Sequence, residues 1–446
     1  MPKRAPKNPR PPRLDLVDAV VLEVYGLVHD QGWLADRALE RALRRERKLW
    51  ASERRLAAES LYGLLRMQGQ LEWLLAGGAP GAPGRGLTLP ARYAAWLVRF
   101  GGARPGDVAA RLAVPAAALR GLEGADERIA AIEDAHLRLA VEGSLPTWIV
   151  ERFVAELGEE EARSLVRILN ERAPLTVRAN LLLGDRDALR AKLAEEQVGA
   201  EPTRLSPWGL VLDGHQNAFA LRCFQDGWFE IQDEGSQLIA LACAARPGKL
   251  VVDACAGAGG KSLALAAEMH NKGTLWALDS DADRLGEARR RATRAHVDNL
   301  RTRPIPAGAE AAEALADLRG KAAVVLVDAP CSGLGTLRRK PDARWRLKPE
   351  DPLRFAALQR ELLARFAELV APGGRLVYAT CAMGRTENAD VAEYAARELG
   401  LAPAPLDGLL GAERAAAVGA RGNQVELFPH RHGTDGFFFA AFTRAR

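Results

Sequence analysis

Apolar residues follow two different patterns along the chain. From residue 14 to about residue 75 they recur with a helical period, most densely in ERRLAAESLYGLLRMQGQLEWLL, which predicts amphipathic helices. The stretch AGGAPGAPGRG, which begins at Ala76, is rich in glycine and proline and interrupts this pattern. A second helical stretch follows from Pro90 to about Leu139. We therefore expect one α-helical domain over residues 14–141.

Strands dominate the rest of the chain. PLTVRAN, WGLVLDG and GWFEIQDEGSQ are short alternating segments beside turn glycines, and they predict a small α/β module over residues 145–237. From Lys249 to Arg446, strands that are apolar throughout alternate with helical segments, which is typical of a doubly wound parallel sheet. The predicted fold is therefore multidomain, with a helical domain, a small α/β module and a C-terminal Rossmann-like α/β domain over residues 238–446.

Charge and composition narrow the classes of partner. The formal net charge is +5, and residues 1–13 carry five cations and no acid, so the remaining residues sum to zero. Contacts with a polyanion must then come from local patches or from this basic arm, unless the arm is only a disordered, solubilising tail. No apolar run approaches the roughly 20 residues that cross a bilayer, so we expect a soluble, cytoplasmic protein.

Two of the five cysteines follow the ends of predicted strands. VVLVDAPCSGLG is a buried strand that stops at Asp328 and is followed by Cys331, and GGRLVYATC ends in Cys381. Open parallel sheets place their chemistry at the carboxyl ends of strands, so we expect both thiols and the Asp328 carboxylate to face one pocket. No Cys-x-x-Cys pair and no zinc spacing occurs, which indicates neither a metal site nor a disulfide framework.

A glycine-rich turn between a strand and a helix predicts a cofactor loop. In LVVDACAGAGGKSLALAAEM the glycines allow a tight turn and a close approach to a ligand, and a helix begins near Lys261. The spacing differs from the G-x-G-x-x-G of dinucleotide sites. The next strand, TLWALD, ends in Asp279, where a carboxylate can accept both hydroxyls of a ribose, so we expect an adenosine-containing cofactor. The predicted cofactor-binding residues are Cys255, Ala256, Gly257, Ala258, Gly259, Gly260, Lys261, Asp279 and Asp328.

With these residues in place, the chain resembles the Sun-type (Fmu-like) RNA cytosine-5 methyltransferases. DACAGAGGK is similar to the family's S-adenosylmethionine loop, ALDSDADRL to its ribose-binding strand end, DAPCSGLGTLRRKPDARWR to its fourth motif and YATCAMGRTENADV to its sixth. The helical stretch resembles the NusB-like domain of the bacterial members that act on small-subunit ribosomal RNA. The chain departs from the family in Gly257-Ala258, in Ala382 after Cys381, and in the lack of an acid after Asn299, which leaves adenine recognition open.

The resemblance implies S-adenosylmethionine as the cofactor and a cytosine of RNA, expected to be ribosomal, as the substrate. It also implies that Cys381 attacks carbon 6 of the base and that Cys331 assists release. The residues alone leave this order open, because the Pro-Cys of a fourth motif is the nucleophile in DNA cytosine-5 methyltransferases. A cysteine suits the attack because it is both a nucleophile and a leaving group. Asp328 would bind the nitrogen 3 edge of the base or the cofactor's amino group, and Lys261 would orient the base or Asp328.

A basic run that contains one aromatic residue follows the fourth-motif cysteine and suits phosphate contact and base stacking, although a solvated helix face would look the same. The predicted RNA-binding residues are Arg338, Arg339, Lys340, Arg344, Trp345 and Arg346. We expect a monomer with no membrane and no metal. The alternatives are a methyltransferase for transfer RNA, another RNA, a protein or a small molecule; a non-enzymatic RNA-binding or antitermination-like factor; and a nicotinamide dehydrogenase, which the glycine spacing disfavours.

Overall fold

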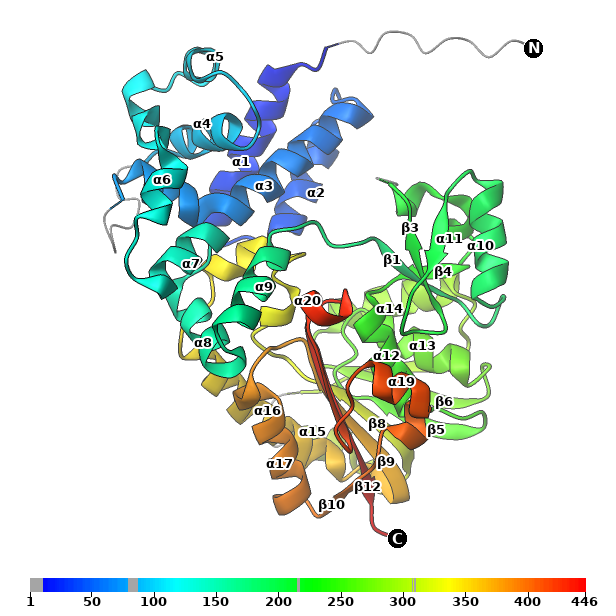
Figure 1. Ribbon diagram of the computed structural model, residues 1–446. Helices are drawn as coiled ribbons and strands as arrows, with labels where there is room; N and C mark the ends of the chain where they lie inside the picture. Colours follow the sequence, from blue (N-terminus) through cyan, green and yellow to red (C-terminus); the bar gives the residue numbers. More distant parts are fainter. Residues whose placement is uncertain (1–10, 79–86, 215–216, 307, 309) are drawn as a thin grey trace, which may run out of the picture. The chain divides into compact units, whose positions relative to one another are not determined.

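The apolar repeat near the N-terminus folds into the helices drawn in blue and cyan in Figure 1. Their apolar side chains are buried against one another. The structure is a computed structural model that describes residues 11–78, 87–214, 217–306, 308 and 310–446. Val24, Leu61 and Leu64 are fully buried between these helices. The helices are α1 (Leu14–Gln31), α2 (Ala35–Arg45), α3 (Ala51–Leu75), α4 (Leu89–Arg99), α5 (Pro105–Arg111), α6 (Ala125–Ala130), α7 (Ala135–Gly143), α8 (Thr147–Leu157) and α9 (Glu159–Leu169).

The described residues among 11–170 form one compact unit together with Arg339–Leu347, and we call this the helical unit. It extends beyond the predicted boundary at residue 141, because α8 and α9 pack with α7. Gly143 permits this packing, since a Cβ atom there would lie only 2.1 Å from Val166 of α9.

Arg13, the last cation of the predicted basic arm, contacts the helical unit. Arg13 donates a hydrogen bond to Glu53 over 2.6 Å, and its guanidinium lies 4.2 Å from the centroid of the Trp50 ring. These contacts tie Arg13 to the helical unit. The other four cations of the predicted arm lie outside the described residues.

The middle segment forms a small antiparallel sheet with βαββαβ connectivity and the strand order β2-β3-β1-β4. Its core includes Leu210 and Phe229, which are fully buried. The sequence pattern did not predict the short strand β2, because Ala200 is its one buried residue and no apolar alternation marks it. The elements are β1 (Thr176–Ala179), α10 (Arg186–Glu195), β2 (Ala200–Pro202), β3 (Gly209–Leu212), α11 (Arg222–Gln225) and β4 (Phe229–Ile231).

The C-terminal segment forms an eight-stranded sheet in the order β10-β12-β9-β8-β5-β6-β7, and β11 pairs with β12. Strands β5 to β9 are parallel to one another, whereas β12 is antiparallel to β9. The strands are β5 (Lys249–Asp253), β6 (Gly273–Asp279), β7 (Leu300–Pro304), β8 (Ala322–Asp328), β9 (Val370–Thr380), β10 (Leu401–Pro403), β11 (Gln424–Leu427) and β12 (Phe437–Arg444).

Helices cover both faces of this sheet, which confirms the doubly wound prediction. One face packs against α12 (Glu234–Cys243), α13 (Gly260–Glu268) and α14 (Ala282–Arg294), and the other against α15 (Glu310–Ala314), α16 (Asp351–Ala367) and α17 (Ala389–Glu398). The central strand β8 is apolar because it is covered on both sides. Within the described ranges, no helix is long and apolar enough to cross a membrane.

Candidate active site

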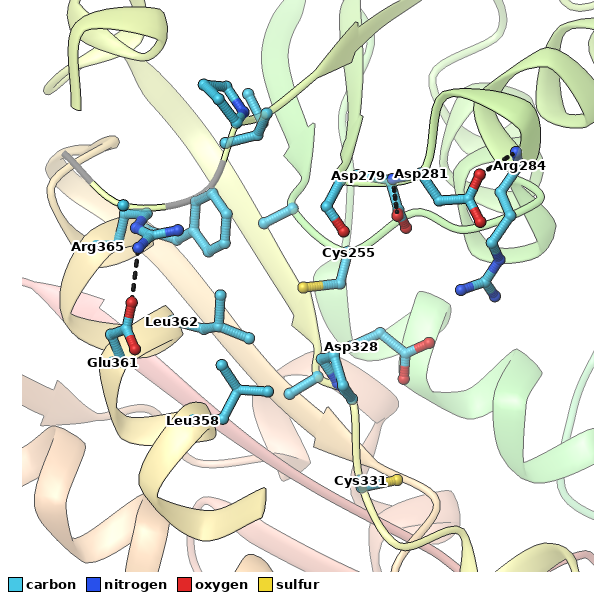
Figure 2. Close-up of a pocket in the computed structure, with 18 of the residues that line it drawn as sticks. Cys255, Asp279, Asp281, Arg284, Asp328, Cys331, Leu358, Glu361, Leu362 and Arg365 are labelled. Carbon is cyan, nitrogen blue, oxygen red and sulfur yellow. Dashed lines mark hydrogen bonds and ion pairs between the residues drawn. The ribbon is translucent and has the colours of Figure 1, made fainter. Parts of the chain in front are cut away.

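The carboxyl ends of β8 and β9 meet at one edge of the sheet. The two strands are neighbours, and Asp328 pairs with Ala379. Cys331 follows β8 and Cys381 follows β9, and their Sγ atoms lie 3.3 Å apart. Both thiols and Asp328 line a pocket of about 620 Å³, part of which is drawn in Figure 2. The prediction that one pocket collects these three groups is therefore confirmed.

The two thiols are electrostatically unequal. The hydrogen bond with Cys381, reinforced by burial, raises the pKa of Cys331 well above the usual range of a thiol. Cys331 therefore remains a thiol at neutral pH. Either sulfur can donate the hydrogen bond that joins the pair.

Lys261 forms an ion pair with Asp328, which lines the pocket, with 2.6 Å between Nζ and Oδ2. Burial lowers the pKa of Lys261, but the negative charges of Asp328, Asp253 and Cys381 outweigh that effect and raise it. Lys261 is therefore a cation that is paired with the Asp328 carboxylate. Asp253 is 1% exposed, and burial raises its pKa to about 7 although the Ser262 hydroxyl donates to it over 2.6 Å.

The loop after β5 depends on its glycines. Gly257 and Gly259 have φ angles of 53° and 80°, in the left-handed region that favours glycine. A Cβ atom at Gly259 would lie 2.9 Å from Ala288 of α14. Asp279, at the end of β6, accepts hydrogen bonds from the N–H groups of Gly257 over 2.7 Å and Asp281 over 2.9 Å. These bonds hold the Asp279 carboxylate at the edge of the pocket.

Part of the pocket wall is apolar. Figure 2 shows Leu358 and Leu362 on α16, across the pocket from Cys255 and the strand ends. Burial raises the pKa of Cys255 well above that of an ordinary thiol, so it lines the pocket as a neutral group. The apolar lining residues are Ala254, Ile305, Pro306, Ala329, Pro330, Leu358, Leu362 and Phe366. An apolar wall of this kind can pack against the flat face of a base. It does not require the acid that is missing from the strand after Asn299.

Sequence reasoning missed the residues that hold the two cysteine loops. Glu387 is fully buried and accepts hydrogen bonds from the Ser332 N–H over 2.8 Å and the Gln359 amide over 3.1 Å, which fixes the turn after the fourth-motif cysteine. Asn388 accepts the Thr380 hydroxyl over 2.7 Å, beside the sixth-motif cysteine. Both residues lie in YATCAMGRTENADV, but their spacing does not distinguish a buried carboxylate or amide from an exposed one.

The predicted RNA-binding run requires a correction at Arg344 and Trp345. Both belong to Arg339–Leu347, which folds with the helical unit. Arg344 is fully buried and donates to the Leu169 carbonyl over 2.7 Å, and the Trp345 indole donates to the Leu65 carbonyl over 2.9 Å. Arg344 therefore has a structural role in place of the predicted contact with RNA, whereas Trp345 is held by the same unit but is only half-buried.

The remaining members of the run differ in exposure. Arg338 is 7% exposed and donates to the Arg172 carbonyl over 2.7 Å, so it is also held by the protein. Arg339 is half-buried, whereas Lys340 and Arg346 are exposed. These last three stay candidates for RNA contact. In the part of the chain that the structure describes, no group of His, Cys, Asp and Glu side chains is placed to hold a metal ion.

The fold and the pocket define a class: an α/β enzyme of the doubly wound type, with a nucleoside-sized site beside two strand-end thiols. Residues 240–443 match the family model 16S rRNA methyltransferase RsmB/F, and residues 145–218 match the RsmF/B-like ferredoxin-like domain. The chain belongs to the RsmB/F methyltransferase family.

Relatives and solved structures agree with this assignment. The probable ribosomal RNA small subunit methyltransferase B of Bacillus subtilis is 35% identical over 324 residues, which are 70% of this chain and 69% of that one. A protein of the same description from Synechocystis is 29% identical over 436 residues, 92% and 95% of the two chains. The crystal structure of PH0851 shares the fold, with a TM-score of 0.76 at 24% identity over 98% of this chain and 99% of that one.

Proposed function

We propose that this protein transfers a methyl group from S-adenosylmethionine to carbon 5 of a cytosine in small-subunit ribosomal RNA. The observation that carries the proposal is the 3.3 Å approach of the Cys331 and Cys381 sulfurs in the pocket that Asp279 also borders. Carbon 5 of cytosine needs a covalent nucleophile to become reactive, whereas oxygen and nitrogen acceptors do not. The descriptions of the relatives as ribosomal RNA small subunit methyltransferases support the choice of RNA.

The pocket residues fit S-adenosylmethionine. Asp279 accepts two backbone N–H groups and retains further acceptor sites for the two ribose hydroxyls. The apolar wall that contains Leu362 and Phe366 suits the adenine, and the volume of about 620 Å³ is typical of a ligand site. When bound, the cofactor supplies the methyl group, as a sulfonium electrophile, that carbon 5 takes up.

Cys381 starts the reaction as a thiolate. Its electron pair forms a bond to carbon 6, and the electrons of the C5–C6 double bond move into the ring and make carbon 5 nucleophilic. The Lys261 cation stabilises the thiolate before the attack and the charge on the ring after it. Asp328, which Lys261 holds by its ion pair, hydrogen-bonds the edge of the base.

Cys331 acts after methylation. The pKa of Cys331 is raised chiefly by its hydrogen bond with Cys381. Once the Cys381 sulfur is bonded to carbon 6, this cause is gone, and Cys331 releases its proton to water more readily. The resulting thiolate removes the proton from carbon 5, the double bond re-forms, and the bond between Cys381 and carbon 6 breaks.

Methylation mapping tests this proposal. The full chain is incubated with S-adenosylmethionine and unmethylated small-subunit ribosomal RNA, and bisulfite sequencing then locates 5-methylcytosine. We expect one protected cytosine with the wild-type protein and none with Cys381→Ala. Methylation of transfer RNA alone, or of a nitrogen or oxygen atom detected by mass spectrometry of nucleosides, would contradict the proposal.

We also propose that the helical unit is NusB-like and binds RNA through α2. This helix and the turn after it expose a cluster of cations near Trp33 and Trp50. The Arg41 guanidinium lies over the Trp33 ring, 5.2 Å from its centroid. The exposed cations are Arg37, Arg41, Arg44, Arg45, Arg47 and Lys48. Phosphate contact by such a cluster makes RNA affinity depend on salt.

A pair of matched double variants tests this surface. Arg41→Gln with Arg47→Gln removes two exposed cations at α2, and Arg104→Gln with Arg120→Gln removes two exposed cations elsewhere on the helical unit. We expect the first double variant alone to weaken RNA binding and to lower the slope of log affinity against log salt by about 1–2. Equal effects of both variants would show that α2 is no specific contact.

A further inference from the structure

The small sheet carries a buried pair of opposite charges that the proposed reaction does not use. Arg178 on β1 and Glu230 on β4 are direct cross-strand partners, and each is 3% exposed. Partners of this kind point to the same face of a sheet. On that face they reach the cofactor loop, residues 255–261, by two separate routes.

Arg178 reaches the loop directly. Its guanidinium donates to the Gly260 carbonyl over 2.9 Å and also to the side chain of Gln232. Burial lowers the pKa of Arg178 to about 10, so it remains charged at neutral pH and its hydrogen bonds are charge-assisted. Gly260 opens α13 and precedes Lys261, so this bond fixes the peptide plane from which the Lys261 side chain extends toward Asp328.

Glu230 reaches the loop through one intermediate residue. It pairs with Arg291 of α14 over 2.8 Å, and Arg291 donates to the Ala258 carbonyl over 2.9 Å. Arg294 of the same helix also pairs with this carboxylate. The small sheet therefore orients two carbonyl groups of one short loop, at Ala258 and at Gly260.

We propose that the small α/β module is part of the cofactor site, and that Arg178 and Glu230 are positioning residues for the cofactor loop. Gly257 and Gly259 give this loop its turn but bring the largest conformational freedom of any residue. Carbonyl anchors remove that freedom before the ligand arrives, so less entropy is lost on binding. The identity of the ligand, S-adenosylmethionine, rests on the proposed function.

Substitutions that keep shape test the two routes in the full chain. Arg178→Met removes the donors but keeps a long side chain, Arg178→Lys keeps the charge, and Glu230→Gln keeps the shape without the charge. Arg375→Met is the control: Arg375 is half-buried and, like Arg178, donates to a backbone carbonyl, that of Cys243, but it pairs with Val324 at the start of β8, away from the pocket. Thermal unfolding confirms that each variant is folded.

Two measurements follow. Calorimetry with S-adenosylmethionine should show affinity reduced about tenfold in Arg178→Met, partly restored in Arg178→Lys, reduced less in Glu230→Gln and unchanged in Arg375→Met. The Michaelis constant for the cofactor should rise while kcat at saturating cofactor changes little. Hydrogen exchange of the amides of residues 255–261, measured without cofactor, should be faster in Arg178→Met and Glu230→Gln than in the wild type.

The two proposals fail in different ways. A wild-type protein that does not bind S-adenosylmethionine would overturn the proposed cofactor, and hydrogen exchange would still test whether Arg178 and Glu230 hold the loop. Unchanged exchange of residues 255–261 in Arg178→Met would overturn the positioning role. That role would also be overturned if Arg375→Met weakened cofactor binding as much as Arg178→Met does, since the effect would then be general.

Discussion

The sulfur atoms of Cys331 and Cys381 lie 3.3 Å apart, and the hydrogen bond between them raises the pKa of the Cys331 thiol. In the proposed mechanism negative charge therefore resides first on Cys381, which attacks, and Cys331 becomes a base only after Cys381 has formed a bond to carbon.

The two cysteines should fail in different ways when replaced. Cys381→Ala should abolish methyl transfer and form no covalent complex with RNA, because the attacking thiolate is absent. Cys331→Ala should still attack and methylate but should not remove the proton from carbon 5, so the enzyme stays bound to RNA. A denaturing gel after incubation with S-adenosylmethionine and target RNA separates these results. A shifted band from Cys381→Ala alone would reverse the assignment.

Asp279→Ala should weaken the binding of S-adenosylmethionine by roughly 1–3 kcal/mol, because the ribose hydroxyls lose a charged acceptor. Calorimetry measures the change. Asp283→Ala is the matched control, since Asp283 is an exposed acid in the first turn of α14 and does not line the pocket. Equal affinities of Asp279→Ala and the wild type would remove Asp279 from the cofactor site.

Asp253 should make the stability of the protein fall as pH rises. Burial raises its pKa to about 7 in the folded state, far above its unfolded value, so the folded state holds a proton that the unfolded state has lost. The stabilising contribution is complete below the unfolded pKa and disappears as pH rises through about 7. Asp253→Asn removes this effect and still accepts the Ser262 hydroxyl.

Denaturant unfolding at two pH values checks this. The wild type should lose stability between pH 5 and pH 8 through Asp253, and Asp253→Asn should not. The unfolding free energy of Asp253→Asn minus that of the wild type should therefore be about 1–3 kcal/mol larger at pH 8 than at pH 5. The comparison with the wild type cancels the contribution of Glu268, whose pKa burial raises to about 8 and which acts in the same direction. A difference between the two proteins that is constant with pH would contradict the assigned pKa of Asp253.

Arg344→Met should destabilise the helical unit by roughly 2–4 kcal/mol, because it leaves buried carbonyl oxygens without a donor. Lys340→Met, a change at an exposed cation of the same segment, should alter the unfolding free energy by about 0.5 kcal/mol or less. Guanidinium unfolding followed by tryptophan fluorescence compares the two. Removal of residues 1–141 would not isolate the role of Arg344, because it would also remove Leu65, whose carbonyl accepts the Trp345 indole N–H.

Much of the site was predictable because it depends on local pattern and on one rule of topology. The apolar runs that end in Asp328 and Thr380 are strands, and parallel strands in one sheet end at the same edge. Side-by-side placement of Cys331 and Cys381 follows from that rule. The turn at Gly257 and the carboxylate of Asp279 follow equally from a strand, a glycine-rich turn and the next strand along.

By itself, the sequence determined the strands β5 to β9, the glycine-rich turn and the shared edge of the two thiols, since these depend on local pattern and on one rule of topology. Tertiary structure decided what became of the buried charges. From the sequence alone Arg344 is predicted to contact RNA, because its hydrogen-bond partners lie 174–278 residues away along the chain. Arg178 resembles any polar residue in a strand until it meets Gly260, 82 residues on. A charged side chain is buried only where donors and acceptors from distant segments satisfy it, and such a match is a property of the folded chain alone.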